Sequence, residues 1–310
     1  MASRAPRVKA VERRHGLGLA ELLDRSFKYW ALLPALLVLL ALTVHPAFNL
    51  LRMSVSTIEF VEGVEIWAFT PARNLELLLQ DWVFRTALWN TFVFVVAAVS
   101  AEMVLGFAIA LLVSRLSAGK GIVRTLMVLP ILVPPVAIGS MWKLMYNFEF
   151  GVFNQALMAA GLGPVSWLGS TDHALWSIII VDIWHWTPFV FLILLAGVEA
   201  LPAEVLEAAR VDGANRRQML FRVIIPLMWP AISVALMFRT IFAFKVFDEV
   251  FLLTSGGPGT ATEVVALYIY KVFFAQNQLG YGALLSIAVI LAIAVFIFTY
   301  RRFARLRGDA

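Results

Sequence analysis

Residues 82–114 read WVFRTALWNTFVFVVAAVSAEMVLGFAIALLVS, an apolar run of 33 residues with two charged members, Arg85 and Glu102. About 20 mostly apolar residues in a helix are enough to cross about 30 Å of hydrocarbon. The run therefore predicts a membrane-spanning helix. Its surplus length predicts that the helix tilts or projects out of the bilayer.

Five other stretches are long and apolar enough to cross a membrane. They cover residues 29–51, 122–146, 174–198, 224–254 and 280–300. The stretch over 122–146 contains Pro130, Pro134 and Pro135, so we expect a broken helix, because proline removes backbone donors. The stretch over 29–51 is too long for a cleaved signal peptide and is interpreted as a retained anchor. The sequence thus predicts an all-α integral membrane protein with six transmembrane helices.

The composition agrees with a membrane location and excludes several other classes. Apolar residues make up 61% of the chain and charged residues 15%, against about 45–50% and about 25% in soluble globular proteins. The chain has no cysteine, so disulfides, thiolate metal sites and cysteine nucleophiles are excluded. Its formal charge of +5 is not gathered in one patch, so nucleic acid is not an expected partner.

Lysine and arginine residues mark one side of the membrane. Eighteen of them lie in the N-terminal segment, two alternate loops and the tail, whereas four lie in the opposite loops. Because cytoplasmic loops carry the excess of positive charge, we expect both termini to be cytoplasmic. The expected organisation is a basic segment over 1–28, a six-helix domain over 29–302 and a tail over 303–310.

The sequence carries no motif for hydrolysis or for metal binding. The nearest match to a phosphate-binding loop, Gly119-Lys120-Gly121, lacks the upstream glycine and the hydroxyl residue. The four histidines are isolated from one another, and no GxSxG motif is present. We therefore expect no metal site and no enzymatic activity on this chain.

The loop between the fourth and fifth spans has a helical pattern of its own, LPAEVLEAARVDGANRRQMLFRVIIP over 201–226. Pro202 suits the start of a helix, Gly213 can supply the left-handed residue that ends it, and Asn215 can cap a second helix. Two interpretations stay open. The apolar side of the first helix docks into a groove on a partner, or the loop lies on lipid headgroups with its arginines.

The same loop resembles the EAA loop of binding-protein-dependent ABC importer permeases. That pattern is Glu-Ala-Ala, three residues, Gly, nine residues, Ile, one residue, Leu-Pro, and here Glu207-Ala208-Ala209, Gly213 and Pro226 match it. Val223 and Ile225 depart from it in shape but not in polarity. The resemblance implies a type I ABC importer permease fold in which the loop over 201–222 forms a coupling helix. The residues implied to contact a separate ATPase subunit are Glu207, Ala208, Ala209, Asp212 and Gly213.

A second resemblance covers 238–248, 253–263 and 268–270, which are similar to the fifth span and outer loop of maltose-type carbohydrate permeases, in particular their F-like member. It implies a sugar, polyol or sugar derivative as solute and the bacterial inner membrane as location. It also implies a second permease subunit, two ATPase subunits that hold ATP and Mg²⁺, and a periplasmic or lipid-anchored solute-binding protein as partners.

Charge inside a membrane span is costly and usually faces the protein interior. Eight ionisable residues of the predicted spans are considered for an interior pair or a path. They are Glu102, Lys143, Asp182, His185, Arg239, Lys245, Asp248 and Glu249. Lys245 and Asp248 are three residues apart and would share a helix face. They are interpreted either as an interior ion pair or as a gate or substrate contact in a translocation path.

A sugar presents hydroxyl groups and C–H faces, so its path needs polar groups beside aromatic rings. The candidate path residues are Trp142, Tyr146, Asp182, Trp184, His185, Arg239, Phe244, Lys245, Phe247 and Asp248. Two alternatives stay open. Trp142 and Tyr146 are also typical of an aromatic belt at the membrane interface, and Phe244 and Phe247 also suit ordinary helix packing.

Two outer loops have informative sequences. Residues 53–81 are predicted to form a short hairpin or an interfacial helix. Gly256, Gly257 and Pro258 give the other loop a composition that favours flexibility. This loop is either a plain connector or, by the same resemblance, a contact for the solute-binding protein or its solute.

The resulting hypothesis is a permease subunit whose spans rock when partner subunits close around ATP. The alternatives are an ion-coupled secondary transporter of a small polar solute, for which we find no inverted repeat, and a non-transporting scaffold. The sequence does not name the solute, and Arg239 and Lys245 permit an anionic sugar derivative.

Overall fold

The structure is a computed structural model of the 310-residue chain and describes residues 19–308. Most of the basic segment expected over 1–28 and the last two residues of the tail lie outside the described residues. The chain divides into two compact units, Met1–Arg52 and Met53–Ala310. The described part of the first unit belongs to one helix, α1 (Leu19–Ser54), which contains Pro34 and Pro46.

The second unit begins with an antiparallel hairpin, β1 (Ser56–Val61) and β2 (Val64–Phe69), in which Ser56 pairs with Phe69. Helix α2 (Pro71–Gln80) follows it. The predicted hairpin is thus confirmed, and the segment over 53–81 also contains a helix. Asn74 of α2 is buried and donates to the Ser54 and Ser56 carbonyls at 2.9 and 3.1 Å, which joins α2 to the start of the hairpin.

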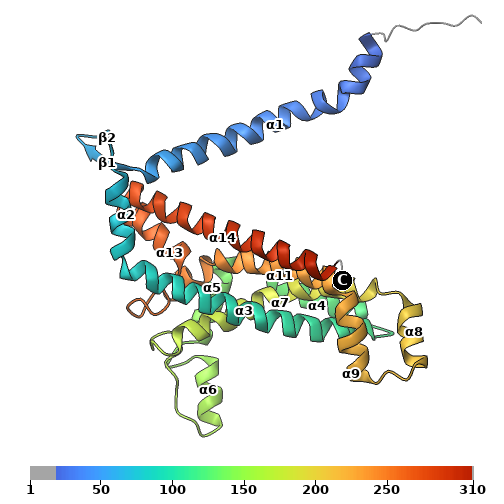
Figure 1. Ribbon diagram of the computed structural model, residues 1–310. Coiled ribbons are helices and arrows are strands. Elements are labelled where there is room, and N and C mark those ends of the chain that lie inside the picture. The colour runs from blue at the N-terminus through green and yellow to red at the C-terminus, as the bar shows by residue number, and fades with distance from the viewer. Residues whose placement is uncertain (1–18, 309–310) are drawn as a thin grey trace, which may run out of the picture. The chain divides into compact units, whose positions relative to one another are not determined.

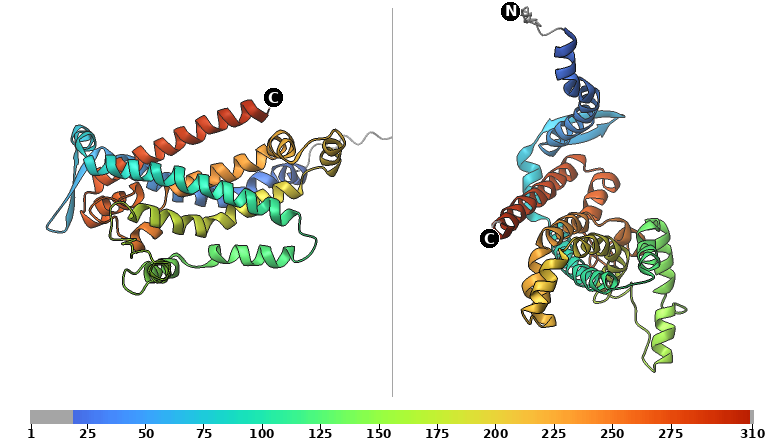
Figure 2. Two further views of the ribbon diagram at one scale, coloured as in Figure 1. Left: turned by 90° about the horizontal axis from the view of Figure 1, so that it is seen from below. Right: turned by 90° about the vertical axis from the view of Figure 1, so that its right-hand side faces the viewer.

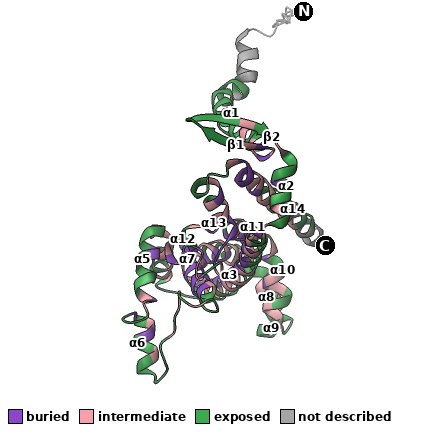
Figure 3. Ribbon diagram, turned by 90° about the vertical axis from the view of Figure 1, so that its left-hand side faces the viewer, coloured by how far each residue is buried: buried purple, intermediate pink, exposed green. Residues whose placement is uncertain are grey.

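The centre of the second unit is the pair of helices α3 (Trp82–Ser114) and α7 (Ala174–Glu199), and α11 (Trp229–Phe244) packs against both of them. Figure 3 shows the buried residues gathered in the middle of this helix bundle. The remaining helices of the bundle are α4 (Lys120–Leu132), α5 (Pro135–Met145), α12 (Asp248–Leu253), α13 (Val265–Tyr270) and α14 (Leu279–Gly308), with π-helix η2 (Lys271–Ala275) between the last two.

Six membrane spans can be counted in the described residues. Four are single helices, Tyr29–Ser54, Trp82–Ser114, Ala174–Glu199 and Leu279–Tyr300. The other two are bent pairs: Lys120–Leu132 with Pro135–Met145, at 92°, and Arg216–Leu227 with Trp229–Phe244, at 68°. The break expected in the third span is confirmed at Val133 and Pro134, between α4 and α5.

The fifth span differs from the continuous stretch expected over 224–254. It bends at Met228, between Pro226 and Pro230, and α11 ends at Phe244. A separate short helix, α12, starts at Asp248, where two acidic residues favour the positive end of a helix. The consequence is a break in the span beside the charged residues of the candidate path.

The loop after α7 forms the predicted pair of helices. Helix α8 (Ala203–Val211) is followed by Asp212 and then by Gly213, whose φ is +80°. Asn215 then caps α9 (Arg216–Gln218) in a capping box with Gln218, with both hydrogen bonds at 2.9 Å. A π-helix, η1 (Met219–Ile224), and α10 (Ile225–Leu227) lead back into the bundle. Figures 1 and 2 place α8 and the β1–β2 hairpin at opposite ends of the bundle, which we call the α8 end and the hairpin end.

At the hairpin end, Asp81 joins three helices. Its Oδ1 accepts from Phe84 N at 2.9 Å and so caps α3, while its Oδ2 accepts from the hydroxyls of Tyr268 and Tyr281 at 2.6 and 2.5 Å. Burial, together with this contact to a carboxylate, raises the pKa of the Tyr268 phenol. The hydroxyl therefore remains a donor well above neutral pH.

We expect Gly106→Ala to lower the stability of the protein. Gly106 of α3 faces α7, and a Cβ there would lie 2.8 Å from Val190 Cγ1 and 3.0 Å from Phe191 N. Overpacking of this kind costs about 1–3 kcal/mol. Gly121→Ala is the matched control, because a Cβ at that helical position meets nothing within 4 Å. Thermal unfolding in detergent measures both variants, and an equal melting temperature for the two would contradict the prediction.

Candidate functional site

Arg239 lies at the centre of a buried cluster of charges that joins three helices. It extends from α11 and is 1% exposed. Its Nη2 donates to Glu102 Oε1 of α3 at 2.8 Å and to Asp182 Oδ2 of α7. The guanidinium also lies 5.2 Å from the ring centre of Trp186. Since an unpaired buried charge is strongly destabilising, the two carboxylates and the arginine stabilise one another.

Of the two interpretations given for Lys245 and Asp248, the interior ion pair is wrong. Among the described residues neither side chain makes an ion pair, because α11 ends before Lys245 and the two residues do not share one helix face. The interior pairs are instead Arg239 with its two carboxylates and His185 Nδ1 with Glu249 Oε1, at 3.0 Å.

A cavity of about 120 Å³ lies beside this cluster. Six of the predicted path residues meet there: Asp182, His185, Arg239, Lys245, Phe247 and Asp248. The other lining residues are Pro135, Trp186, Phe242, Val246 and Glu249. Lys245 and Asp248 are exposed, whereas Asp182, His185 and Glu249 are buried. The cavity therefore combines hydrogen-bonding groups with aromatic rings.

The list of candidate path residues leaves out Trp186, Phe242 and Glu249, which also line the cavity. Trp186 lies four residues after Asp182 and one after His185, so the helical period of α7 carried a signal for it. Glu249 was visible as an intramembrane carboxylate. Its contact with His185, which is 64 residues away, depends on how α12 packs against α7.

The remaining candidate aromatics lie elsewhere. Trp142 and Tyr146 are 6% and 4% exposed, so their assignment to an interfacial belt is wrong. They pack in one cluster with Phe153, Trp167 and Trp184, with ring centres 5.3–6.0 Å apart. Phe153 belongs to α6 (Val152–Ala159), in the segment that folds over them. This cluster forms a core of the fold.

Phe244 and Phe247, three residues apart, have different surroundings. Phe244 packs against Phe296 of α14, with ring centres 6.1 Å apart, and does not line the cavity beside Arg239. Phe247 lines that cavity and stacks on Phe251 at 5.3 Å. Phe244 therefore packs between helices, as its alternative interpretation had it, and Phe247 stays a candidate for the path.

The predicted coupling residues lie together on α8 and the turn after it. Glu207, Ala208, Asp212 and Gly213 are exposed, and Ala209 is half-buried. Val205 and Val211 are 41% and 88% exposed. The structure thus shows a projecting helix whose apolar side chains are largely uncovered by the described part of the chain.

The predicted outer-loop residues lie between α12 and α13. Gly256 is buried, with Gly257 and Pro258 half-buried. Hydrogen bonds from other elements hold this loop, despite a composition that favours flexibility. Within residues 19–308, no group of three or more His, Asp or Glu side chains could hold a metal ion.

These features define a multi-pass helical membrane protein with a polar cavity inside its bundle and a projecting helix at one end. Residues 102–307 match the model of the family described as "binding-protein-dependent transport system inner membrane component", and the chain belongs to this family. It is therefore a permease subunit of the inner membrane. The type I ABC importer permease fold is confirmed, and the ion-coupled alternative finds no support.

Relatives with assigned transport systems cover nearly the whole chain. The trehalose/maltose transport system permease protein MalF of Thermococcus litoralis is 34% identical, over 92% of this chain and 96% of its own. The trehalose transport system permease protein SugA of Mycobacterium tuberculosis is 32% identical, over 94% and 92%. A bacterial ABC transporter that imports the acidic polysaccharide alginate has the same fold in its matching chain, with a TM-score of 0.79 at 22% identity, over 93% of this chain and 98% of that one.

Proposed function

We propose that this chain is the membrane-spanning subunit of an ATP-driven importer that carries a sugar, polyol or sugar derivative by alternating access. The observation that carries the proposal is α8, an uncovered helix with the sequence Glu207-Ala208-Ala209 before the left-handed Gly213. The relatives named for trehalose and maltose support a carbohydrate as the solute.

The motor of this importer is a separate pair of ATPase subunits that bind ATP and Mg²⁺. We assign the loop over 201–222 to the cytoplasm and place Glu207, Ala208, Ala209, Asp212 and Gly213 in a cleft of the ATPase. An amphipathic helix seated in a groove is a common mode of recognition, and the exposed Val205 and Val211 suit it. Closure of the ATPase pair would then move the six-helix domain over 29–302.

The other proposed partners are a second permease subunit and a periplasmic or lipid-anchored solute-binding protein. The family description, which names a binding protein, supports the latter. With α8 in the cytoplasm, the hairpin end faces outward, and both termini are cytoplasmic. The excess of lysine and arginine in the termini and in the loops assigned to the cytoplasm supports this orientation.

The charges around the cavity favour an uncharged solute. Three carboxylates line the cavity, on Asp182, Asp248 and Glu249, against the cations of Arg239 and Lys245. The guanidinium of Arg239 is already bound by two carboxylates, so it is not free to bind a substrate anion. Polar groups beside the rings of the cavity suit the hydroxyls and C–H faces of a neutral sugar or polyol.

Uptake and hydrolysis assays test the proposed function. Affinity purification of this chain from its host membrane should recover an ATPase subunit and a second permease. Thermal shift of the companion binding protein, screened over sugars, polyols and sugar acids, should identify a neutral solute. That solute should stimulate ATP hydrolysis by the reconstituted complex. Uptake that collapses with an uncoupler at constant ATP, or purification without any ATPase, would contradict the proposal.

A further inference from the structure

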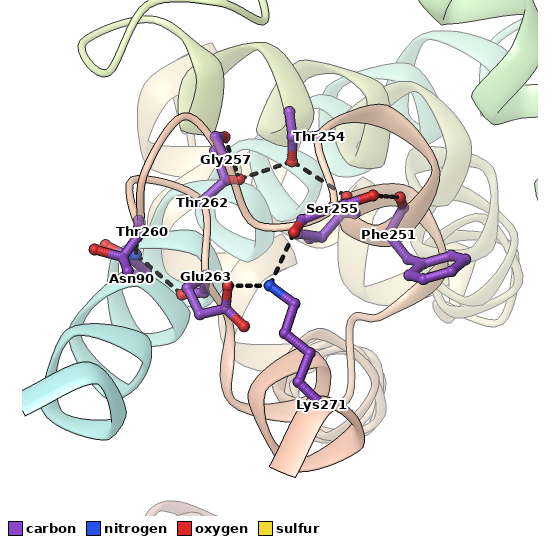
Figure 4. Close-up of polar contacts among 10 residues, drawn as sticks. Asn90, Phe251, Thr254, Ser255, Gly257, Thr260, Thr262, Glu263 and Lys271 are labelled. Carbon is purple, nitrogen blue, oxygen red and sulfur yellow. Dashed lines mark hydrogen bonds and ion pairs between the residues drawn. The ribbon is translucent and has the colours of Figure 1, made fainter. Parts of the chain in front are cut away.

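The loop that joins α12 to α13 is fastened to α3 (Figure 4). Asn90 of α3 is buried, and its Nδ2 donates to the carbonyls of Thr260 and Glu263 at 3.0 and 2.9 Å. The next residue, Thr91, accepts at Oγ1 from Val265 N at 3.0 Å. Side chains of one long helix thus fix the second half of the loop and the start of α13.

Lys271 of η2 closes the neck of the same loop (Figure 4). Its Nζ donates to Ser255 O at 2.9 Å and to Glu263 Oε2 at 2.6 Å. Ser255 follows Thr254, the residue that caps the end of α12, and Glu263 precedes Val264, the residue that caps the start of α13. The lysine therefore joins the two ends of the loop, beside a hydroxyl contact of Thr254 Oγ1 with Thr262 Oγ1 at 2.7 Å.

The neck is built closely around this ion pair. Gly256 has a φ of +92°, and a Cβ at this position would lie 2.1 Å from Glu263 Oε2 and 2.8 Å from Lys271 Nζ. The glycine is thus needed for its backbone conformation and for the space that the pair occupies. Glu263 is 2% exposed, and its Oε1 has no hydrogen-bond partner within residues 19–308. Lys271 is the one cation that pairs with this carboxylate among the described residues.

We propose that Lys271 and Glu263 are positioning residues that hold the loop over 255–263 as a preformed contact surface for the solute-binding protein. This inference rests on the proposed function. Ser255 and Gly259 are exposed on the loop, so a protein docked at the hairpin end can reach them. The same loop continues directly into α12, whose first residues, Asp248 and Glu249, line the cavity. Docking on the loop is thereby joined mechanically to the cavity wall.

The test is a titration of the solute-binding protein against ATP hydrolysis by the reconstituted transporter. Lys271→Met should raise the concentration for half-maximal stimulation about tenfold, while the maximal rate and the hydrolysis without binding protein stay near those of the unchanged chain. Lys271→Arg should restore most of the affinity, because it keeps the charge. Lys143→Met is the matched control, since Lys143 is an exposed lysine with no ion pair among the described residues.

A second measurement separates the loop from general stability. The chain has no cysteine, so Ser255→Cys gives a unique position for a nitroxide label on this chain, which is labelled before it is assembled with its partners. Lys271→Met should increase the mobility of this label, and Lys143→Met should not. If Lys271→Met does not accumulate, the double variant Lys271→Met, Glu263→Gln is used in both assays instead. The second substitution removes the buried carboxylate that would be left unpaired.

Two results would overturn the inference. One is an unchanged half-maximal concentration in Lys271→Met when the unchanged chain responds normally. The other is equal label mobility with and without the lysine. If no binding protein stimulates even the unchanged chain, the proposed function fails instead, which keeps the two conclusions distinguishable.

Discussion

Arg239→Met is expected to destabilise the protein by about 3–5 kcal/mol, because it leaves two buried carboxylates without their cation. Glu102 and Asp182 are 0% and 1% exposed, so both carboxylates would lose their main partner while they remain poorly solvated. The loss should appear as a lower melting temperature of the purified protein in detergent and as loss of uptake by cells.

Neutralising the carboxylates should reverse much of this effect. The triple variant Arg239→Met, Glu102→Gln, Asp182→Asn carries no unpaired charge at the cluster. Its melting temperature should be well above that of Arg239→Met alone. Arg73→Met is the control, because Arg73 is exposed and makes no ion pair among the described residues. If Arg239→Met and Arg73→Met have the same melting temperature, the cluster does not stabilise the bundle.

Gly213→Val is expected to reduce solute-stimulated ATP hydrolysis by the complex about tenfold or more, because β-branched residues rarely adopt its φ of +80°. A Cβ at this position meets nothing within 4 Å, so the change acts through the backbone turn that ends α8. The reoriented helix would no longer fit the cleft that we propose on the ATPase subunit.

The matched control for this variant is Gly213→Asn, because asparagine tolerates the left-handed conformation. It should keep most of the stimulated hydrolysis. Both variants should retain the melting temperature of the bundle, since α8 projects from it (Figure 1). Equal hydrolysis by the valine and asparagine variants would remove the turn at Gly213 from the coupling mechanism.

The features that the sequence predicted well are local ones. The apolar runs predicted the spans, and the prolines predicted the break between α4 and α5. The residues Gly213 and Asn215 predicted the turn between α8 and α9. Each of these signals acts within a few residues. The bend at Met228 was missed, although Pro226 and Pro230 flank it.

The charge pairs could not be predicted because they depend on packing between distant parts of the chain. Arg239 binds residues that are 137 and 57 positions away, and no local rule selects Glu102 or Asp182 among the intramembrane acids. The expected pairing of Lys245 with Asp248 assumed one helix through both. That assumption failed because α11 stops at Phe244.

The valines exposed on α8 also bear on the supply of the protein in the cell. If α8 is covered by an ATPase subunit as proposed, a copy made in excess of that subunit would present Val205 and Val211 to water. Uncovered apolar residues favour aggregation and recognition by quality-control proteases. We therefore expect the steady-state amount of this chain to follow the synthesis of the ATPase and to fall when the ATPase gene is deleted. Degradation of unassembled copies would then match the amount of this chain to the amount of the ATPase, without a separate regulatory protein.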